Sequence, residues 1–262
     1  MRRWLVTLAL AGCGGGGGSD VDAGPDADLG QPSIAGTPVS TFETTGCSTA
    51  VVIELSRQVA EETDCLMPGQ LVQFDVVAGI QITGAAVLPY LGGDARTDLY
   101  AAASMASDAP IQITSAFRTV VQQWLLFRWF QQGRCGITAA ADPGTSNHES
   151  GRAIDVSNYS TWITMLGTHG WAHDVPGDPV HFDHNASADV RHADIQAFQR
   201  LWNRNAPDDP IAEDGNYGPA TEARLKRSPA EGFGIGATCA ARRRFDVARS
   251  DTAALPLGIE AD

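Results

Sequence analysis

The decapeptide at residues 146–155, SNHESGRAID, decides how the middle of this chain must fold. It places His148 and Asp155 seven residues apart, with Gly151 and Ala153 between them. Two small residues let the backbone turn closely, so the chain can pass the same point twice. A histidine nitrogen and a carboxylate oxygen that meet at one point are donors for a zinc ion, which holds them at about 2.0–2.2 Å. The decapeptide therefore predicts a metal site.

A second segment, GDPVHFDH at residues 177–184, completes the donor set. His181 lies about 26 residues beyond Asp155, and Asp178 precedes His181 by three residues. A catalytic zinc site needs three protein ligands and one open position. A carboxylate beside that position can take the proton of an attacking water. The two segments together predict metal-assisted hydrolysis, with His184 as the alternative to His181.

These segments resemble the zinc D-alanyl-D-alanine carboxypeptidases and dipeptidases, which include enzymes of vancomycin resistance and related phage endolysins. That family shares S-x-H-x-x-G-x-A-x-D and a later E/D-x-x-H, and residues 146–155 and 178–181 match both in order and spacing. Residues 115–119, SAFRT, followed by Gln123, are similar to the family's S-G-Y-R-S-x-x-x-Q segment. Three motifs in the correct order over roughly 70 residues are much more specific than one alone.

The resemblance implies that His148, Asp155 and His181 bind Zn²⁺, with a water in the fourth position. It favours His181 over His184, because the family's ligand directly precedes a phenylalanine and Phe182 follows His181. The remaining histidines are interpreted as wall or surface residues: His169, His173 and His192.

The resemblance also implies roles for four other polar residues. Asp178 would be the general base toward the water and then the acid toward the leaving amine. Arg118 would polarise the scissile carbonyl and stabilise the oxyanion. Ser146 and Gln123 would help to hold the substrate. Two positions depart from the usual pattern: residue 116 is Ala instead of Gly, and residue 178 is Asp where many carboxypeptidases have Glu. The phage endopeptidase branch often has Asp, so the subtype stays open.

Residues 194–233 resemble the small three-helix peptidoglycan-binding domain that is often attached to wall hydrolases. The matching features are Gln199-Arg200-Leu201, Asp214-Gly215-Asn216-Tyr217-Gly218-Pro219, Thr221 and Leu225. The D-G-x-y-G-P pattern predicts a tight turn with glycine at positive φ, followed by Pro at a helix start. Family members usually close with an apolar residue and Gln, whereas this chain has Arg227-Ser228-Pro229. A purely structural helical cap is therefore the alternative to glycan binding.

The beginning of the chain predicts export. Two arginines precede a short apolar run at residues 4–11, which is too short to span a membrane as a mature helix. The run ends in Leu10-Ala11-Gly12-Cys13, which resembles the lipobox of bacterial lipoproteins and implies a lipid on the Cys13 thiol. An ordinary signal peptide with a chance cysteine is the alternative. Residues 14–40 are rich in Gly, then in Asp, Ala and Pro, which is typical of a flexible tether.

The net charge and the export signal limit the classes of binding partner that we expect. The formal net charge is -13, from 31 acidic and 18 basic residues, and no Lys/Arg run longer than three residues is present. Nucleic-acid binding requires neutralised phosphates, so we expect no nucleic-acid partner. We expect peptidoglycan stem peptides and glycan as partners, a membrane contact through the lipid anchor, and a monomer. The predicted location is the bacterial cell envelope, in the periplasm or at the outer membrane.

Four cysteines remain after Cys13: Cys47, Cys65, Cys135 and Cys239. An even number in an exported protein indicates disulfides, and four cysteines allow three pairings. We favour Cys47 with Cys65 and Cys135 with Cys239, because the first two flank one expected helix.

The pattern along the chain predicts an α+β fold. Apolar periodicity indicates helices at residues 48–64, 94–107, 120–132 and 161–169, and strands at residues 79–87, 110–115, 154–156 and 180–182. We expect a small antiparallel sheet with flanking helices, and the resemblance implies the fold shared by D,D-peptidases and hedgehog domains. The expected divisions are a signal peptide (1–12), a lipidated tether (13–40), a catalytic domain (41–190), a peptidoglycan-binding-like helical domain (191–240) and a tail (241–262).

The combined prediction is a zinc peptidase that cuts a bond next to a D-amino acid in wall peptides, with D-alanyl-D-alanine carboxypeptidase activity favoured. One alternative is an endopeptidase of the L-Ala-D-Glu or D,D type. The other is a non-catalytic wall-binding lipoprotein, since a related signalling domain keeps the fold with little or no peptidase activity. Arg118 and Asp178 argue against the latter, because a scaffold needs neither a base nor an oxyanion partner.

Overall fold

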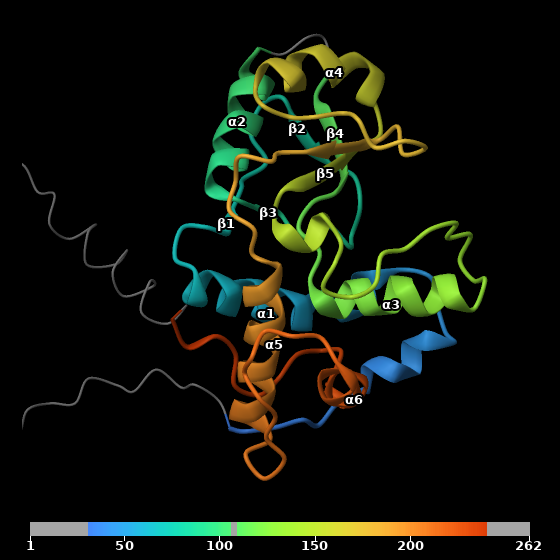
Figure 1. The fold of residues 1–262 in the computed structure, drawn as a ribbon, viewed down its shortest axis with the longest axis vertical. Coiled ribbons are helices and arrows are strands. Elements are labelled where there is room, and N and C mark those ends of the chain that lie inside the picture. Colours follow the sequence, from blue (N-terminus) through green and yellow to red (C-terminus); the bar gives the residue numbers. More distant parts are fainter. Residues whose placement is uncertain (1–30, 106–108, 240–262) are drawn as a thin grey trace, which may run out of the picture.

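The computed structural model describes residues 31–105 and 109–239 (Figure 1). The expected signal peptide, the Cys13 lipidation site, most of the tether and the C-terminal tail lie outside these residues. Across the part that is described, we find no helix with the length and apolar character needed to cross a bilayer.

A four-stranded sheet forms the centre of one half of the molecule (Figure 1). Its strands are β2 (Ile80–Ile82), β4 (Ile111–Ser115), β5 (Ala153–Val156) and β6 (His181–Asp183), in that spatial order. The pairs β4–β5 and β5–β6 are antiparallel, as expected from the sequence. The edge strand β2 runs parallel to β4, so the sheet is mixed rather than wholly antiparallel.

Two helices cover the sheet, and all of these elements share one hydrophobic core. They are α2 (Gly93–Ser104) and α4 (Tyr159–Thr168). The buried side chains of this core come from both helices and from all four strands, and they include Ile80, Leu99, Ile113, Ile154, Trp162, Leu166 and Phe182. A second, two-stranded sheet pairs β1 (Val72–Gln73) with β3 (Tyr90–Leu91). Two-residue strands are too short to show alternation, which is why the sequence did not indicate them.

The other half of the molecule is a helical layer (Figure 1). It contains α1 (Ile53–Leu66), α3 (Val120–Gln131), α5 (Arg191–Asn205) and α6 (Pro219–Arg227). The short 3-10 helices η1 (Val39–Glu43) and η2 (Thr49–Val52) complete it. Buried residues from all of these elements form one core, including Val39, Val52, Leu55, Trp124, Trp129, Phe198, Trp202 and Leu225. The expected boundary at residue 191 stays a prediction, and the helices that follow it share this core with α1 and α3.

Local sequence signals account for where several helices begin and end. The Ser48 hydroxyl accepts the N–H of Ala50 at the start of η2, and the Thr119 hydroxyl accepts the N–H of Gln122 at the start of α3. Such side-chain caps satisfy helix N–H groups that have no backbone partner. After α3 the chain passes through Gly133 at φ 63°, a conformation that glycine adopts without strain. Together, these helices and the two sheets confirm the predicted α+β fold class.

The disulfide pairing expected from the sequence was wrong. The structure links Cys47 to Cys135 and Cys65 to Cys239, with Cα–Cα distances of 5.3 and 5.6 Å. Cys47 precedes α1 and Cys65 lies at its far end. A 14-residue helix is about 21 Å long, whereas a disulfide needs Cα atoms within about 7 Å. The helix between them keeps Cys47 and Cys65 apart.

We predict that peptide mapping of the unreduced protein will recover Cys47 joined to Cys135 and Cys65 joined to Cys239. Because the bridges join residues 88 and 174 positions apart, reduction should lower the free energy of unfolding by about 2–5 kcal/mol per bridge. Thermal unfolding with and without reductant measures that loss. A recovered Cys47–Cys65 peptide would contradict the pairing.

Candidate metal centre

Three neighbouring strands place three polar side chains in one row across the sheet. Ser115 on β4 is the register partner of Asp155 on β5, and Asp155 is the partner of His181 on β6. Side chains directly opposite each other on adjacent antiparallel strands have Cβ atoms about 4.5–5.5 Å apart. The register therefore brings a carboxylate and an imidazole together, although they are distant in sequence.

His148 reaches the same place from a short 3-10 helix, η3 (His148–Ser150). The Ser146 hydroxyl accepts the backbone N–H of His148 at 3.3 Å, and Gly151 ends the turn at φ 72°. A Cβ on Gly151 would come within 3.2 Å of Leu71 and 3.3 Å of Val190. Glycine is needed there both for its backbone conformation and for close packing.

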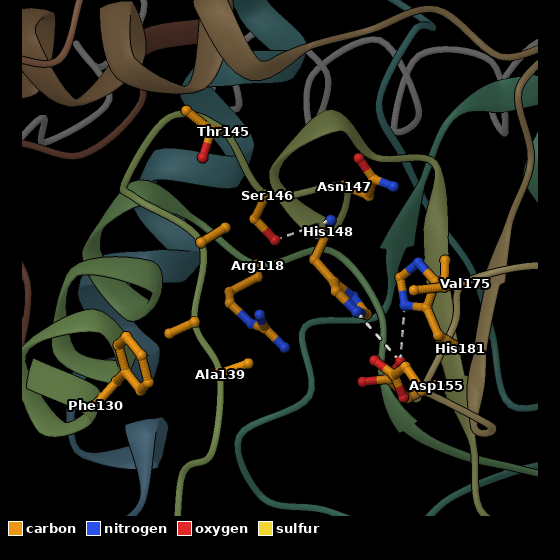
Figure 2. A pocket seen from close by; sticks show the side chains of 13 residues that line it. Arg118, Phe130, Ala139, Thr145, Ser146, Asn147, His148, Asp155, Val175 and His181 are labelled. Atoms are coloured by element: carbon orange, nitrogen blue, oxygen red, sulfur yellow. Dashed lines mark hydrogen bonds and ion pairs between the residues drawn. The ribbon is translucent and has the colours of Figure 1, made fainter. Parts of the chain in front are cut away.

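The three predicted ligands converge (Figure 2). One donor atom each from His148, Asp155 and His181 lies within 4.8 Å of the others. The Asp155 Oδ1 atom is 3.3 Å from His148 Nε2 and 3.1 Å from His181 Nδ1. Tetrahedral zinc ligands at bond lengths of 2.0–2.1 Å are about 3.3 Å apart. Two imidazole nitrogens and a carboxylate oxygen at this spacing fit a zinc ion.

Hydrogen bonds on the outer side of each imidazole fix which nitrogen faces the centre. His148 Nδ1 lies 2.9 Å from the carbonyl oxygen of Ala116, to which it donates. His181 Nε2 lies 3.1 Å from Asp183 Oδ1, and Asn147 donates to the other Asp183 oxygen at 2.9 Å. A proton held on the outer nitrogen leaves the inner lone pair free for a metal.

Asp183 and Asn147 were not among the sequence predictions. A signal for Asp183 was present, since residues two apart on a strand point to the same face. Its position two residues after His181 on β6 therefore places its carboxylate beside that imidazole.

The charges at the centre act strongly on one another. Burial alone would raise the pKa of Asp155, but His148, His181 and Arg118 hold it well below its usual range. Burial opposes protonation of His181, yet its hydrogen bonds to Asp155 and Asp183 raise its pKa to about 9. Burial and the charge of Arg118 lower the pKa of His148. Without an ion, the protonated His181 ring therefore lies between two carboxylates, and the proton on its inner nitrogen, Nδ1, must leave when a metal binds.

The side chain of Arg118 points into the same pocket (Figure 2). Its Nη1 donates to Gln123 Oε1 at 3.0 Å, and its Nη2 donates to Ser115 Oγ at 3.2 Å. Gln123 donates in turn to the carbonyl oxygen of Ala141 at 2.7 Å. The structure thus places Gln123 behind Arg118, with both ends of its amide occupied by protein groups. Its expected role toward substrate stays a prediction.

The comparison with protein families agrees with this geometry. Residues 94–199 match the family model VanY, D-alanyl-D-alanine carboxypeptidase. The VanY match contains the three candidate ligands, Arg118 and Asp178, and it supports a carboxypeptidase-like hydrolase of peptidoglycan. It begins in α2 and ends within α5, so α1 and α6 lie outside it. Searches of curated proteins and of solved structures gave no significant match.

The VanY-like site opens into a pocket of about 610 Å³. Ser146 and Asp178 both line it, and Asp178 is exposed. The expected role of Ser146 toward substrate stays a prediction. Two apolar side chains in the pocket lining, Phe130 from α3 and Val175 from the loop before β6, are each 37% exposed. The pocket therefore combines a polar, charged floor with apolar surface that remains open to solvent.

The remaining histidines lie elsewhere. His184 is buried, with Nε2 at 2.8 Å from Asp98 Oδ2 and Nδ1 at 3.1 Å from Ser187 Oγ, so it is not part of the VanY-like site. His173 packs on Phe182 with ring centroids 4.7 Å apart, as a wall residue. His169 is half-buried and His192 is exposed.

A buried carboxyl group lies directly behind the site. Glu149 accepts the N–H of Gly144 at 2.8 Å and that of Ser146 at 3.0 Å, so it fixes the loop that lines the pocket. Burial raises the pKa of Glu149 to about 7, against the opposing effect of these hydrogen bonds. The sequence gave no sign of this role, because a glutamate beside a histidine is ordinary on a surface.

We predict that Asp183→Asn will weaken zinc binding by about 10–100-fold, because an amide orients the His181 ring less firmly than a carboxylate. Competition with a chromogenic chelator measures the zinc Kd. The matched control is Asp98→Asn, which alters a carboxylate held by His184 outside the site. Equal loss in both variants would mean that the effect is general destabilisation.

We predict that Glu149 makes the metal-free protein less stable as pH rises. The folded state keeps a proton up to about pH 7 that the unfolded state releases near its ordinary value of 4.5. Stability therefore falls as pH rises through this window, by up to about 3 kcal/mol. Urea unfolding at pH 5 and pH 8 measures the difference, and Glu149→Gln should reduce it by the share that Glu149 contributes, about 3 kcal/mol. Glu54→Gln, at an exposed position, should leave it unchanged, and an unaltered difference in Glu149→Gln would refute the assignment.

Proposed function

We propose that this chain is a zinc-dependent peptidase that hydrolyses a peptide bond next to a D-amino acid in peptidoglycan stems, acting as a D-alanyl-D-alanine carboxypeptidase. The observation that carries the proposal is the convergence of His148, Asp155 and His181 within the segment that matches VanY. A zinc ion held by these residues would supply a Lewis acid that activates water and polarises the scissile carbonyl.

The proposed chemistry assigns the remaining steps to side chains of the pocket. The exposed Asp178 carboxylate lines the pocket and takes the proton of the attacking water. The same group then gives that proton to the leaving amine. The guanidinium of Arg118, fixed by Ser115 and Gln123, stabilises the negative charge that develops on the carbonyl oxygen.

A second candidate, an endopeptidase that cuts inside the stem or cross-bridge, is favoured by the charge of the pocket. A carboxypeptidase needs a positive group to receive the terminal carboxylate. Among the described residues that line the pocket, Arg118 is the only fixed cation, and it is already assigned to the oxyanion. An endopeptidase needs no such positive group, because its substrate has further residues beyond the bond that is cut.

The proposal includes the place of action. An export signal and a lipid on Cys13 would hold the enzyme at the cell envelope, and the tether would let it reach the wall. A monomer is sufficient for the proposed reaction, because one chain provides every residue assigned above.

We predict that Asp178→Ala will still bind one zinc ion but will lose at least about 100-fold in kcat, because the general base is gone. Metal analysis after gel filtration gives the zinc content, and release of D-alanine from a pentapeptide stem gives the rate. Asp174→Ala, which removes another exposed carboxylate in the same loop, is the control and should keep the wild-type rate. Full activity in Asp178→Ala would remove the base assignment.

Digestion of defined muropeptides, with and without a chelator, decides between the two candidates. Loss of a single terminal D-alanine supports the carboxypeptidase, whereas separation into two larger fragments supports the endopeptidase. Hydrolysis that continues at full rate after complete zinc removal would contradict both.

A further inference from the structure

A second cavity, here named the junction pocket, lies where the helical layer meets the loop beside the metal site. Its volume is about 480 Å³. Its walls are Pro143 and Gly144 of that loop, the segment at the start of α5, and the turn at residues 215–217. Neither the candidate ligands nor the proposed base and oxyanion partner belong to it.

One loop separates the junction pocket from the metal pocket. Gly144 lines the first, and the next residue, Thr145, lines the second. Arg191 of α5 donates to the carbonyl oxygen of Thr145 at 3.1 Å, which ties the loop to the helical layer. A substrate that passes over Thr145 therefore reaches from one pocket to the other within a few residues, since an extended chain advances about 3.4 Å per residue.

The lining of the junction pocket suits a neutral, polar ligand. Among the described residues that line it, the fixed charges are Asp189 and Arg191, and these pair with each other at 3.0 Å. Asn216 and His192 are exposed and offer both donors and acceptors. Tyr217 adds an aromatic side chain to the lining. The hydroxyl and amide groups of a sugar can form hydrogen bonds with polar side chains of this kind. Its apolar C–H faces can pack on an aromatic ring.

The walls are held in place before any ligand binds. Buried Gln199 accepts the N–H of Gly215 at 2.8 Å and donates to the carbonyl oxygen of Asn216 at 3.2 Å, so the turn is fixed from behind. Gly144 packs closely on α5, where an added Cβ would come within 2.9 Å of Ile195. A preformed pocket loses little conformational freedom on binding.

We propose that the junction pocket binds an uncharged saccharide unit of the substrate whose peptide enters the metal pocket. This inference rests on the proposed function for the identity of that substrate as peptidoglycan. It assigns sugar recognition to a site shared by the catalytic loop and the helical layer, and not to the helical segment alone.

The test compares two probes on the metal-free protein, a disaccharide-pentapeptide muropeptide and the same pentapeptide without sugar. We expect the wild-type protein to bind the muropeptide about tenfold more tightly in calorimetric titrations, because both pockets contribute. The double variant His192→Ala/Asn216→Ala should bind both probes with the affinity that the wild-type protein has for the pentapeptide without sugar. The matched control is His169→Ala/Asn185→Ala, which removes the same side-chain types at a half-buried and an exposed position that line neither pocket.

Equal wild-type affinity for the two probes would overturn the inference, as would a sugar preference that persists in the double variant. The same probes with zinc present report on the proposed function separately. Hydrolysis of both at equal kcat/KM would keep the peptidase and reject the saccharide site. Tighter muropeptide binding without hydrolysis would keep the saccharide site and reject the peptidase.

Discussion

One carboxylate oxygen, Oδ1 of Asp155, lies within 3.3 Å of two imidazole nitrogens, and the rest of the site is arranged around it. Packing an ionised carboxylate into a partly buried pocket costs free energy unless cations or hydrogen bonds compensate it. Here the compensation comes from His148 and His181, and a metal ion would provide more of it. This requirement is met by placing two of the three ligands, Asp155 and His181, opposite each other on the sheet, whose register fixes their spacing more firmly than a loop would.

The next layer of contacts serves to hold those groups in one orientation. A backbone carbonyl and the Asp183 carboxylate direct the two imidazoles, while Ser115 and Gln123 direct the guanidinium of Arg118. Such groups act before the substrate arrives, so no reorganisation is needed during the reaction. The pocket is thus built with its polar groups already aimed inward, and its apolar rim remains available for substrate.

The helical layer contacts the site from behind. Asp194 of α5 accepts the N–H of Val120 at the start of α3 at 2.7 Å, and burial raises the pKa of this carboxyl well above its ordinary range. The N–H of Val190 donates to Ser150 at the end of η3. Helices α5 and α3 therefore meet immediately behind the loop that carries His148. Displacing the C-terminal helices would therefore shift the loop that carries the metal ligand His148.

The sequence by itself determined the α+β class, most helices and strands, and the three side chains that converge, because local periodicity and motif spacing are written in consecutive residues. It also indicated the turn at residues 214–219, where Gly215 has the expected positive φ of 66° and Pro219 begins α6, although Gly218 is extended. Only the tertiary structure decided the disulfide pairs, the role of Asp183, the position of Gln123 behind Arg118 and the pocket at the junction. These features depend on which distant segments pack together, and contacts of that kind leave no periodic trace along the chain.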